Sequence, residues 1–353
     1  MSATPPASLV GIAAQVSERL EGVLAPELER WAALDPDLGE PMAEIGRLVL
    51  RGGKRLRPAF CHWGFVGAGG SPDDAAVVDA GAAFELMHAF ALFHDDVMDD
   101  ADSRRGEPTT HTVFAERHRA EGWSGESRRF GEGVAILIGD LAFVYSDRLL
   151  AGANATAWEI WNELRIELNV GQVLDILGSV RGVRDVDQAE RICRYKSGKY
   201  TIERPLHLGA ALADPVRFAE IRAGLSAYGL PLGDAFQMRD DVMGAFGDES
   251  ATGKPVGGDL REGKPTPLLA RAIVATTPEQ VSVLDRAGDP DLSDDDVAAI
   301  QQVIVDTGAL DDLESTITHR TEAALAALDE LELDGGASRE LAALAGFVVH
   351  RDV

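Results

Sequence analysis

The sequence predicts an all-α protein, and three observations support this. Alanine and leucine are abundant, aromatic residues make up 6% of the 353 residues, and apolar residues recur every three or four positions through most long segments. No stretch has the composition of a linker, and no fixed period indicates a solenoid. We therefore expect residues 1–353 to form a single helical domain.

The first elements can be placed in order. An amphipathic pattern over residues 9–34 predicts a helix, and Gly52-Gly53 interrupts the next one, with Pro58 suited to the first turn that follows. Residues 79–100 are too long an apolar run for a strand and too interrupted for a membrane span, so they predict a buried helix that ends in carboxylates. Residues 115–131 are polar and contain glycine, which predicts a loop or short connector.

The remaining patterns also predict helices. They cover residues 134–151, 158–177, 186–212 and 218–246. The last hundred residues are expected to be helical as well, with breaks at "TTPEQ", "AGDPDLSDDD" and "LDGGAS".

The net charge of −26 argues against general binding to nucleic acid or anionic lipid, because both reward a basic surface. An anionic substrate would have to be held by local basic groups and metal. The two cysteines, Cys61 and Cys193, are too few for a disulfide framework, and the N-terminal "MSATPPASLV" lacks a basic region followed by a long apolar stretch. We expect a soluble, cytoplasmic protein with no stable membrane insertion.

The segment "HDDVMDDADSRRGEPTTH" gathers five aspartates within eight positions. On an ideal helix Asp95 and Asp99 share a face, and Asp96 lies about 100° round. Two unpaired carboxylates about 5 Å apart repel by roughly 3 kcal/mol at an effective dielectric near 20. Such an oxygen-rich site suits Mg²⁺ completed by water and phosphate oxygens. Taken alone, the motif also fits a solvated acidic helix end.

The same tetrapeptide recurs 145 residues later as Asp240-Asp241-Val242-Met243. Gly244 stands where a third carboxylate would be expected. Two copies, each at the end of a helical run, favour a metal-binding pair over a solvated helix end.

Basic residues cluster near these motifs. "GGKRLRP" supplies Lys54, Arg55 and Arg57, which alone would fit a solvated basic turn. Beside a metal-carboxylate cleft they become a candidate diphosphate clamp, because arginine grips phosphate oxygens bidentately and lysine adds a point charge. Further cations follow each motif: Arg104, Arg105, Lys196, Lys199, Lys254 and Lys264. Two diphosphates, one bound through metal and one held directly by cations, account for all of these groups.

Six motifs together resemble those of the trans-isoprenyl diphosphate synthases, the polyprenyl synthetase family. "GGKRLRP", "HDDVMDDADSRRGEPT", "GQVLDI", "YKSGKYT", "FQMRDDVMGAFGD" and "GKPVGGDLREGKPT" follow the family's order over about residues 45–275. The resemblance implies an isoprenoid synthase-type helical bundle around a central cavity, with the two aspartate motifs facing each other across its mouth. It also implies a homodimer.

The resemblance assigns roles to individual residues. It implies Mg²⁺, two or three ions per active site, held by Asp95, Asp99 and Asp240, with Asp96 and Asp241 in support. The allylic diphosphate would be contacted by Arg104, Lys196, Ser197, Gln237, Lys254 and Lys264. The isopentenyl diphosphate would be held by Lys54, Arg57, His88 and Arg105. Of these residues, Asp95, Asp96, Asp99, Arg104, Lys196, Asp240 and Asp241 would be catalytic.

The implied reaction is Mg²⁺-dependent ionisation of an allylic diphosphate followed by head-to-tail condensation with isopentenyl diphosphate and loss of a proton. Phe90 and Ala91, just before the first motif, resemble the chain-length residues of synthases that make geranylgeranyl diphosphate. Ideal helix geometry does not support Phe90 independently, because it lies about 140° round from Asp95, and ordinary core packing remains an alternative. Farnesyl diphosphate or a longer product also stays open.

Gly244 is a departure from the family's usual third aspartate, so metal at the second motif would be held less tightly or through water. Two rival functions use the same chemistry. A class I terpene cyclase needs no second diphosphate site, and a noncatalytic partner subunit typically lacks some of the charged residues that are intact here. Consumption of isopentenyl diphosphate by the purified chain separates both from a synthase.

Overall fold

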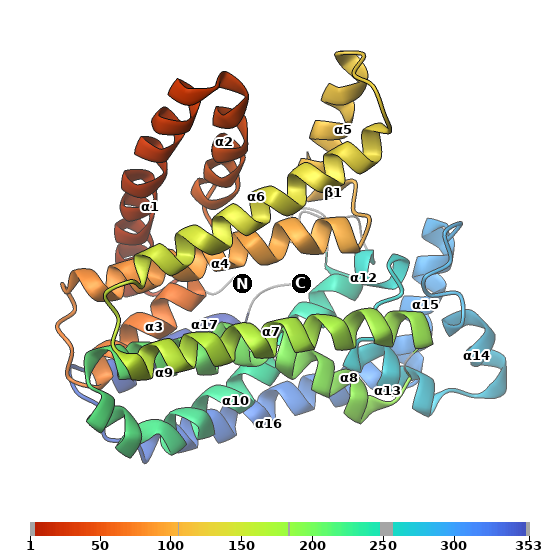
Figure 1. The fold of residues 1–353 in the computed structure, drawn as a ribbon. Helices are drawn as coiled ribbons and strands as arrows, with labels where there is room; N and C mark the ends of the chain where they lie inside the picture. Colours follow the sequence, from red (N-terminus) through yellow and green to blue (C-terminus); the bar gives the residue numbers. More distant parts are fainter. Residues whose placement is uncertain (1–3, 105, 183, 248–256, 351–353) are drawn as a thin grey trace.

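The computed structural model describes residues 4–104, 106–182, 184–247 and 257–350, and these are helical almost throughout (Figure 1). Within these ranges the only strands, β1 (Ser103–Arg104) and β2 (Glu107–Pro108), form a two-residue antiparallel ribbon. The helices are α1 (Ala7–Leu34), α2 (Pro36–Leu50), α3 (Leu56–Gly67), α4 (Ala75–Met98), α5 (Thr110–Ala120), α6 (Ser127–Leu149), α7 (Ala155–Arg181), α8 (Val186–Cys193), the π-helix η1 (Arg194–Glu203), α9 (Arg204–Ala213), α10 (Pro215–Phe246), α12 (Gly258–Arg261), α13 (Pro267–Ala275), α14 (Pro278–Leu284), α15 (Asp294–Asp306), α16 (Ala309–Asp329) and α17 (Ala337–Val349).

The helices form layers around a shared interior. In Figure 1, α4 and α6 run side by side in one layer, and α7, α10 and α16 lie in another. Buried apolar residues connect these layers from Leu9 in α1 to Val349 in α17. The all-α prediction is therefore confirmed, and the two aspartate motifs lie at the ends of α4 and α10.

Both motif-bearing helices have well-defined starts. The Asp74 carboxylate accepts a hydrogen bond from the backbone N–H of Ala76 at the start of α4. Asp214 accepts from two backbone N–H groups at the start of α10, where Pro215 occupies the first helical position. α4 ends at Met98 and α10 at Phe246, so Asp95 and Asp240 both lie within the last two turns of their helices.

The helix between these two is irregular. η1 is a π-helical stretch of ten residues that contains "KSGK", and π-turns occur often at functional sites. Its neighbours approach so closely that only glycine fits. A Cβ at Gly171 of α7 would lie 2.7 Å from Lys196 Cα, and one at Gly233 of α10 would lie 2.6 Å from the Gly198 oxygen. These contacts place η1 between α7 and α10.

The prediction of a loop over residues 115–131 is wrong at both ends. α5 extends to Ala120, and α6 begins at Ser127. The two helices are joined by a small aromatic cluster. His118 packs edge-on against Trp123 and at a tilt against Phe130, with ring centroids 6.0 and 5.2 Å apart. This cluster buries one face of a short polar helix, which the polar composition concealed.

The break at Gly52-Gly53 is confirmed. Both glycines have positive φ, at 93° and 148°, and Arg55 is left-handed as well, at 48°. By length and composition, α4 is long and apolar enough to span a membrane, but 61% of its apolar window is buried inside the fold. That burial is typical of a core helix.

Candidate active site

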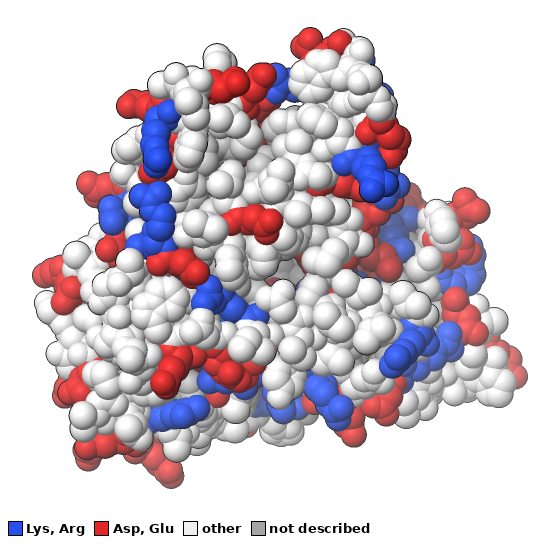
Figure 2. Space-filling view, viewed as in Figure 1, with Lys and Arg blue, Asp and Glu red and all other residues white. Residues whose placement is uncertain are grey.

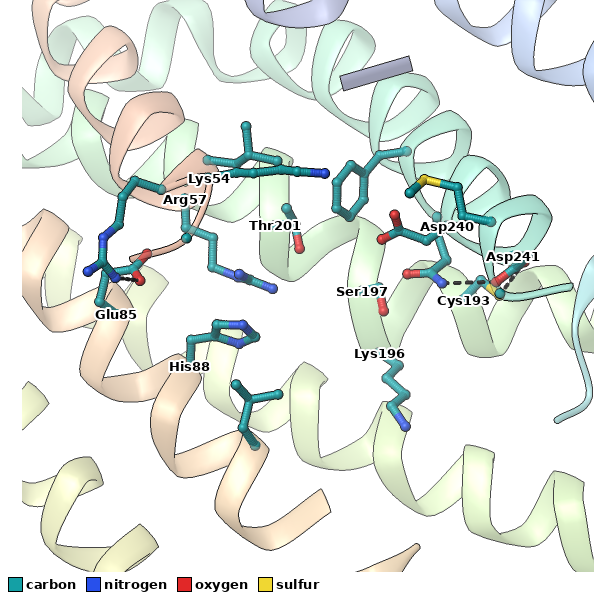
Figure 3. A pocket seen from close by; sticks show the side chains of 18 of the residues that line it. Lys54, Arg57, Glu85, His88, Cys193, Lys196, Ser197, Thr201, Asp240 and Asp241 are labelled. Atoms are coloured by element: carbon teal, nitrogen blue, oxygen red, sulfur yellow. Dashed lines mark hydrogen bonds and ion pairs between the residues drawn. The ribbon is translucent and has the colours of Figure 1, made fainter. Parts of the chain in front are cut away.

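A cavity of about 1050 Å³ lies between α3, α4, η1 and α10. Figure 3 shows Arg57 and His88 pointing into it from one side, with Lys196, Ser197 and Asp240 across from them. It brings together ten residues that the sequence predicted: Lys54, Arg57, His88, Arg104, Lys196, Ser197, Gln237, Asp240, Asp241 and Lys264. Residues from five separate motifs thus meet in one place.

The first aspartate motif reaches this cavity through a lysine. Asp95 Oδ1 accepts hydrogen bonds from Lys196 Nζ at 3.2 Å and from Gln172 Nε2 at 2.9 Å. Lys196 Nζ also donates to Asp175 Oδ2 at 2.5 Å. Lys196 and Asp175 line the cavity, whereas Asp95, Asp96 and Asp99 are not among its lining residues. The negative charge of these three aspartates therefore acts at the edge of the cavity.

Asp96 is turned toward the β-ribbon. Its Oδ1 accepts from both Arg104 Nε and Arg104 Nη2 at 2.6 Å, and Arg104 Nη2 lies 3.8 Å from Asp95 Oδ2. The β1–β2 pairing fixes the backbone at Arg104. Arg104 therefore holds the buried Asp96 while its guanidinium remains at the cavity wall.

The carboxyl groups of the first motif differ in pKa. Burial raises the pKa of Asp95, but the cations Lys196, Lys264 and Arg104 outweigh it, so the net pKa is lowered. Asp99 follows the opposite course: partial desolvation and then the negative charge of Asp95 raise its pKa to about 6, despite Lys264. A pair that shares a face and repels in this way gains from a divalent cation, as the sequence suggested.

The second motif is more deeply buried. Asp241 is 3% exposed. Its Oδ1 accepts from Gln237 Nε2 at 3.0 Å, and Cys193 Sγ lies 3.9 Å from its Oδ2. Burial raises the pKa of Asp241 well above the ordinary value; the Gln237 hydrogen bond lowers it, and the charges of Asp259 and Asp240 raise it further. No cation neutralises Asp241 directly as Arg104 neutralises Asp96, among the contacts of the described residues.

Lys264 links the two motifs. It lines the cavity with Asp240, and its positive charge lowers the pKa of Asp95, of Asp99 and of Asp241. Burial lowers the pKa of the Lys264 ammonium, but the negative charges of Asp259 and Glu262 raise it by more. The net pKa is therefore raised, and the side chain stays charged. Lys264 therefore lies within electrostatic reach of both aspartate motifs.

The donor set fits hard divalent cations. The motifs offer carboxylate oxygens at the edge of a charged cavity, which is what Mg²⁺ prefers. In the described part of the chain no three acidic, histidine or cysteine side chains are gathered closely enough to hold an ion unaided. An ion here would need water or substrate oxygens to complete its coordination, as is usual for Mg²⁺.

At the basic end of the cavity, the two arginines of "GGKRLRP" point in different directions. Arg55 turns inward, where it is 4% exposed, and pairs with buried Glu85 and the Val49 carbonyl. Arg57 instead faces the cavity, with its guanidinium carbon 4.3 Å from the Tyr200 ring centroid. Arg55 therefore has a structural contact, and Arg57 is placed to meet a ligand.

Orphaned polar atoms lie at this end. Arg57 Nε, the Tyr200 hydroxyl and the Thr201 hydroxyl are buried and make no hydrogen bond, and Thr201 lines the cavity at 1% exposure. Leaving buried polar atoms unsatisfied is costly, at about 1–3 kcal/mol each. Such a group beside a cavity indicates that a polar ligand belongs there.

The predicted chain-length residues, Phe90 and Ala91, lie outside this cavity. The Phe90 ring packs 4.8 Å from Phe143 of α6 and 4.7 Å from His94, centroid to centroid. Neither Phe90 nor Ala91 lines the 1050 Å³ cavity, although Ala89 and Leu92 do. Phe90 thus sits on the α6 side of α4, as helix geometry indicated.

Two predicted residues, Arg105 and Lys254, lie outside the described residues. The structure adds others that the sequence assigned no role. Gln172 and Asp175 come from "GQVLDI", a motif noted in the sequence, so a signal existed. Thr201 and Asp259 also lie in such motifs, "YKSGKYT" and "GKPVGGDLREGKPT", but only the fold shows that they border the cavity.

Comparison with known proteins agrees with this geometry. The polyprenyl synthetase family model matches residues 40–304. The chain is 33% identical over 303 residues to the geranylfarnesyl diphosphate synthase of Aeropyrum pernix, covering 83% of this chain and 88% of that protein. It is 32% identical over 268 residues to the geranylgeranyl diphosphate synthase of Saccharolobus solfataricus, covering 73% and 74%.

A solved structure is also similar. The geranylgeranyl pyrophosphate synthase of Corynebacterium glutamicum, complexed with isoprenyl diphosphate and magnesium, superposes with a TM-score of 0.90 at 36% identity, covering 97% of this chain and 99% of that one. The match extends over nearly the whole chain, including the helices beyond the motifs. The chain belongs to the polyprenyl synthetase family and is a prenyltransferase.

Proposed function

We propose that this prenyltransferase condenses isopentenyl diphosphate head-to-tail with an allylic diphosphate and releases geranylgeranyl diphosphate. The observation that carries the proposal is one cavity with carboxylates at one end and a separate basic cluster at the other. A terpene cyclase would have no use for the second, basic end. We also propose that residues 1–353 form one catalytic domain.

Mg²⁺ would be held by Asp95 and Asp99 at the end of α4 and by Asp240 at the end of α10. When bound, it neutralises the charge that develops on the departing diphosphate. Asp96 and Asp241 support these ligands from buried positions, Asp96 through its bond to Arg104 and Asp241 through its bond to Gln237.

The residues between the two motifs would bind the allylic diphosphate. Lys196 and Arg104 already contact carboxylates of the first motif, so their charges are fixed beside the predicted metal site. Ser197, Gln237 and Lys264 line the same wall, and Lys254 is assigned from the sequence alone. Their donors would stabilise the leaving diphosphate, and the departing group would take the proton lost after condensation.

The basic end would hold isopentenyl diphosphate. Lys54, Arg57 and His88 converge on it (Figure 3), and Arg105 is assigned from the sequence alone. The unpartnered Thr201 hydroxyl beside them is consistent with a polar ligand. These residues would keep the second diphosphate away from the metal, so that its double bond faces the ionising carbon.

Product length is the finer part of the proposal. The Saccharolobus and Corynebacterium relatives are named for the geranylgeranyl product and the Aeropyrum relative for the geranylfarnesyl product. We propose that Phe90, which lies outside the 1050 Å³ cavity and packs on Phe143, limits the prenyl tail where it extends beyond that cavity, with Ala91 beside it. Phe90→Ala should lengthen the product by one or more isoprene units, and an unchanged product distribution would remove Phe90 from this role.

A homodimer in the cytoplasm is also proposed. α6 and α7 expose apolar side chains that a monomer would leave in water: Leu137 at 63%, Val144 at 55%, Ile166 at 58%, Val173 at 56% and Val180 at 81%. Figure 2 shows few charges over these helices in this view. Light scattering should give a molar mass of twice the chain mass of 37.6 kDa. Leu137→Glu should shift the measured mass toward that of a single chain.

The test of the reaction is direct. Purified protein is incubated with Mg²⁺, labelled isopentenyl diphosphate and dimethylallyl, geranyl or farnesyl diphosphate in turn, and the products are separated by length. We expect incorporation from at least one allylic starter, ending mainly at twenty carbons. A chain that cyclises the allylic substrate without using isopentenyl diphosphate, or that turns over nothing alone, would contradict the proposal.

A further inference from the structure

One carboxylate of α10 is buried where that helix meets η1. Asp234 is 5% exposed and does not belong to the residues that line the 1050 Å³ cavity. It directly follows Gly233, whose backbone packs against η1 so closely that a Cβ added at Gly198 would lie 3.1 Å from the Gly233 carbonyl carbon. A buried carboxylate is costly unless it is paired and hydrogen-bonded, so the partners of Asp234 explain why it stands at this contact.

Two arginines from different elements bind Asp234. Arg194, the first residue of η1, donates from Nη2 to Oδ2 at 2.5 Å and from Nε to Oδ1 at 3.1 Å. Arg320 of α16 donates from Nη1 to Oδ2 at 2.6 Å. The contact with Arg194 is bidentate, which fixes the orientation of the two groups as well as their distance. Asp234 therefore joins η1, α10 and α16 at one point.

The chain of ion pairs continues from Arg320 to two further elements. Arg320 Nη2 donates to Glu190 Oε2 of α8 at 2.7 Å, and Arg271 Nη2 of α13 donates to Glu190 Oε1 at 2.7 Å. Arg271 Nε also donates to Asp312 Oδ2 of α16 at 2.9 Å. Guanidinium and carboxylate groups thus alternate along the whole network, which connects η1, α10, α16, α8 and α13.

The two elements that meet at Asp234 carry side chains assigned to the allylic diphosphate. Lys196 and Ser197 follow Arg194 by two and three positions on η1. Gln237 follows Asp234 by three positions on α10. The first three of these side chains to be considered, those at positions 196, 197 and 237, all line the cavity. A buried ion pair adds little net stability, because desolvation offsets the attraction, but it can fix how the joined elements sit relative to one another.

We propose that Asp234 is a positioning residue, which holds η1 against α10 through Arg194 so that the diphosphate-binding side chains of both elements converge on the allylic substrate. This inference deepens the proposed function and rests on it. Asp234 touches no substrate and acts only through the elements that it joins. If η1 shifted by about 1 Å, the Lys196 ammonium would be misplaced, and a misplacement of that size can cost about 10²-fold in rate.

Steady-state kinetics test this inference, with farnesyl and isopentenyl diphosphates varied in turn. Asp234→Asn should raise the KM of the allylic diphosphate about tenfold and leave that of isopentenyl diphosphate within about twofold. The second value should hold because Arg57 and His88 come from α3 and α4, which lie outside the network. Arg194→Gln should give the same split, because it breaks the same link from the η1 side. Backbone hydrogen exchange over residues 194–203 should be faster in both variants.

A double-mutant cycle distinguishes one shared link from two independent contributions. If Asp234 acts through Arg194, the double variant Arg194→Gln/Asp234→Asn should lose no more allylic kcat/KM than Asp234→Asn alone. Glu27→Gln is the matched control, because Glu27 is a buried carboxylate of α1 that accepts hydrogen bonds from α6, from Tyr145 at 2.8 Å and from Arg148 at 3.0 Å. It should lower the melting temperature and keep both wild-type KM values.

Four results would overturn the role of Asp234: an unchanged allylic KM in Asp234→Asn, equal increases for both substrates, additive losses in the double variant, or the same kinetic defect in Glu27→Gln. If Asp234→Asn does not fold, Arg194→Gln decides alone, since the Arg194 side chain is 41% exposed and wild-type kinetics there would reject the link. A wild-type chain that consumes no isopentenyl diphosphate would contradict the proposed function, whereas unaltered hydrogen exchange over residues 194–203 would contradict only this inference.

Discussion

The two copies of Asp-Asp-Val-Met have the same sequence and helix position but different surroundings. In the first copy, Asp96 is held by a guanidinium at 2.6 Å. In the second copy, the equivalent Asp241 receives a neutral amide at 3.0 Å. The third position holds Asp99 in one copy and Gly244 in the other, where a carboxylate arrives from α12.

The comparison shows that the motif sets the positions of the carboxylates, whereas the residues packed around the motif set their pKa values. Cations outweigh burial at Asp95, so the pKa of that carboxyl is lowered. Burial dominates at Asp241, so its pKa is raised far above the ordinary value. We infer that Asp95 is ionised before metal arrives, whereas ionisation of Asp241 is disfavoured until a cation is present.

The largest expected effect comes from the ligands themselves. Asp95→Ala and Asp240→Ala should each lower kcat by about 10³-fold, because the loss of electrostatic stabilisation at a developing charge costs 10²–10³ in rate. Steady-state kinetics with farnesyl and isopentenyl diphosphates measure this. Asp102→Asn is the matched control, since Asp102 is exposed near the first motif and should retain wild-type activity. A near-normal kcat in either alanine variant would show that the two motifs do not contribute equally to catalysis.

A smaller effect concerns the partners of the second aspartates. Arg104→Leu should lower the free energy of unfolding by about 3 kcal/mol, since it leaves the buried Asp96 unpaired. Gln237→Leu should lower it by about 1 kcal/mol, because a neutral hydrogen bond contributes less. Urea denaturation at pH 7 measures both. The loss of stability caused by Arg104→Leu should be smaller in an Asp96→Asn background. If Arg104→Leu and Gln237→Leu lowered the free energy of unfolding equally, the two motifs would not differ in charge as proposed.

The smallest expected effect is on pH dependence at the first motif. Asp99 has a pKa of about 6, and only its ionised form binds metal. Mn²⁺ affinity should therefore be full above pH 7 and should fall as pH drops through 6, by several-fold at pH 5. Mn²⁺ alone is the probe, because phosphate groups titrate in the same range. Asp99→Asn should have weaker affinity with a flatter profile, and an equally steep profile would exclude Asp99 as the titrating group.

Sequence patterns predicted most of the fold because the long helices bury regular apolar faces. α4 and α10 follow the predicted segments closely. The pattern failed where a small aromatic cluster stabilises a polar helix, at His118 and Phe130. Local composition could not show that Trp123 would complete that cluster.

The candidate site was predictable to the extent that its residues lie in contiguous motifs. Lys196 and Asp240 could be named because short segments carry them. Asp259 also lies in a motif, "GKPVGGDLREGKPT", but its contact with Gly244 exists only after α12 packs on α10. Arg55 and Arg57 illustrate the same limit: adjacent cations look equivalent in sequence, and only burial separates the one that pairs with Glu85.

The most direct measurement is the anomalous diffraction of Mn²⁺ in crystals grown with pyrophosphate. If the two motifs act together, manganese peaks should appear beside Asp95 and Asp99 and also beside Asp240, with one pyrophosphate bridging the two sets. Peaks at one motif only, or a pyrophosphate that contacts no metal ion, would contradict the shared site.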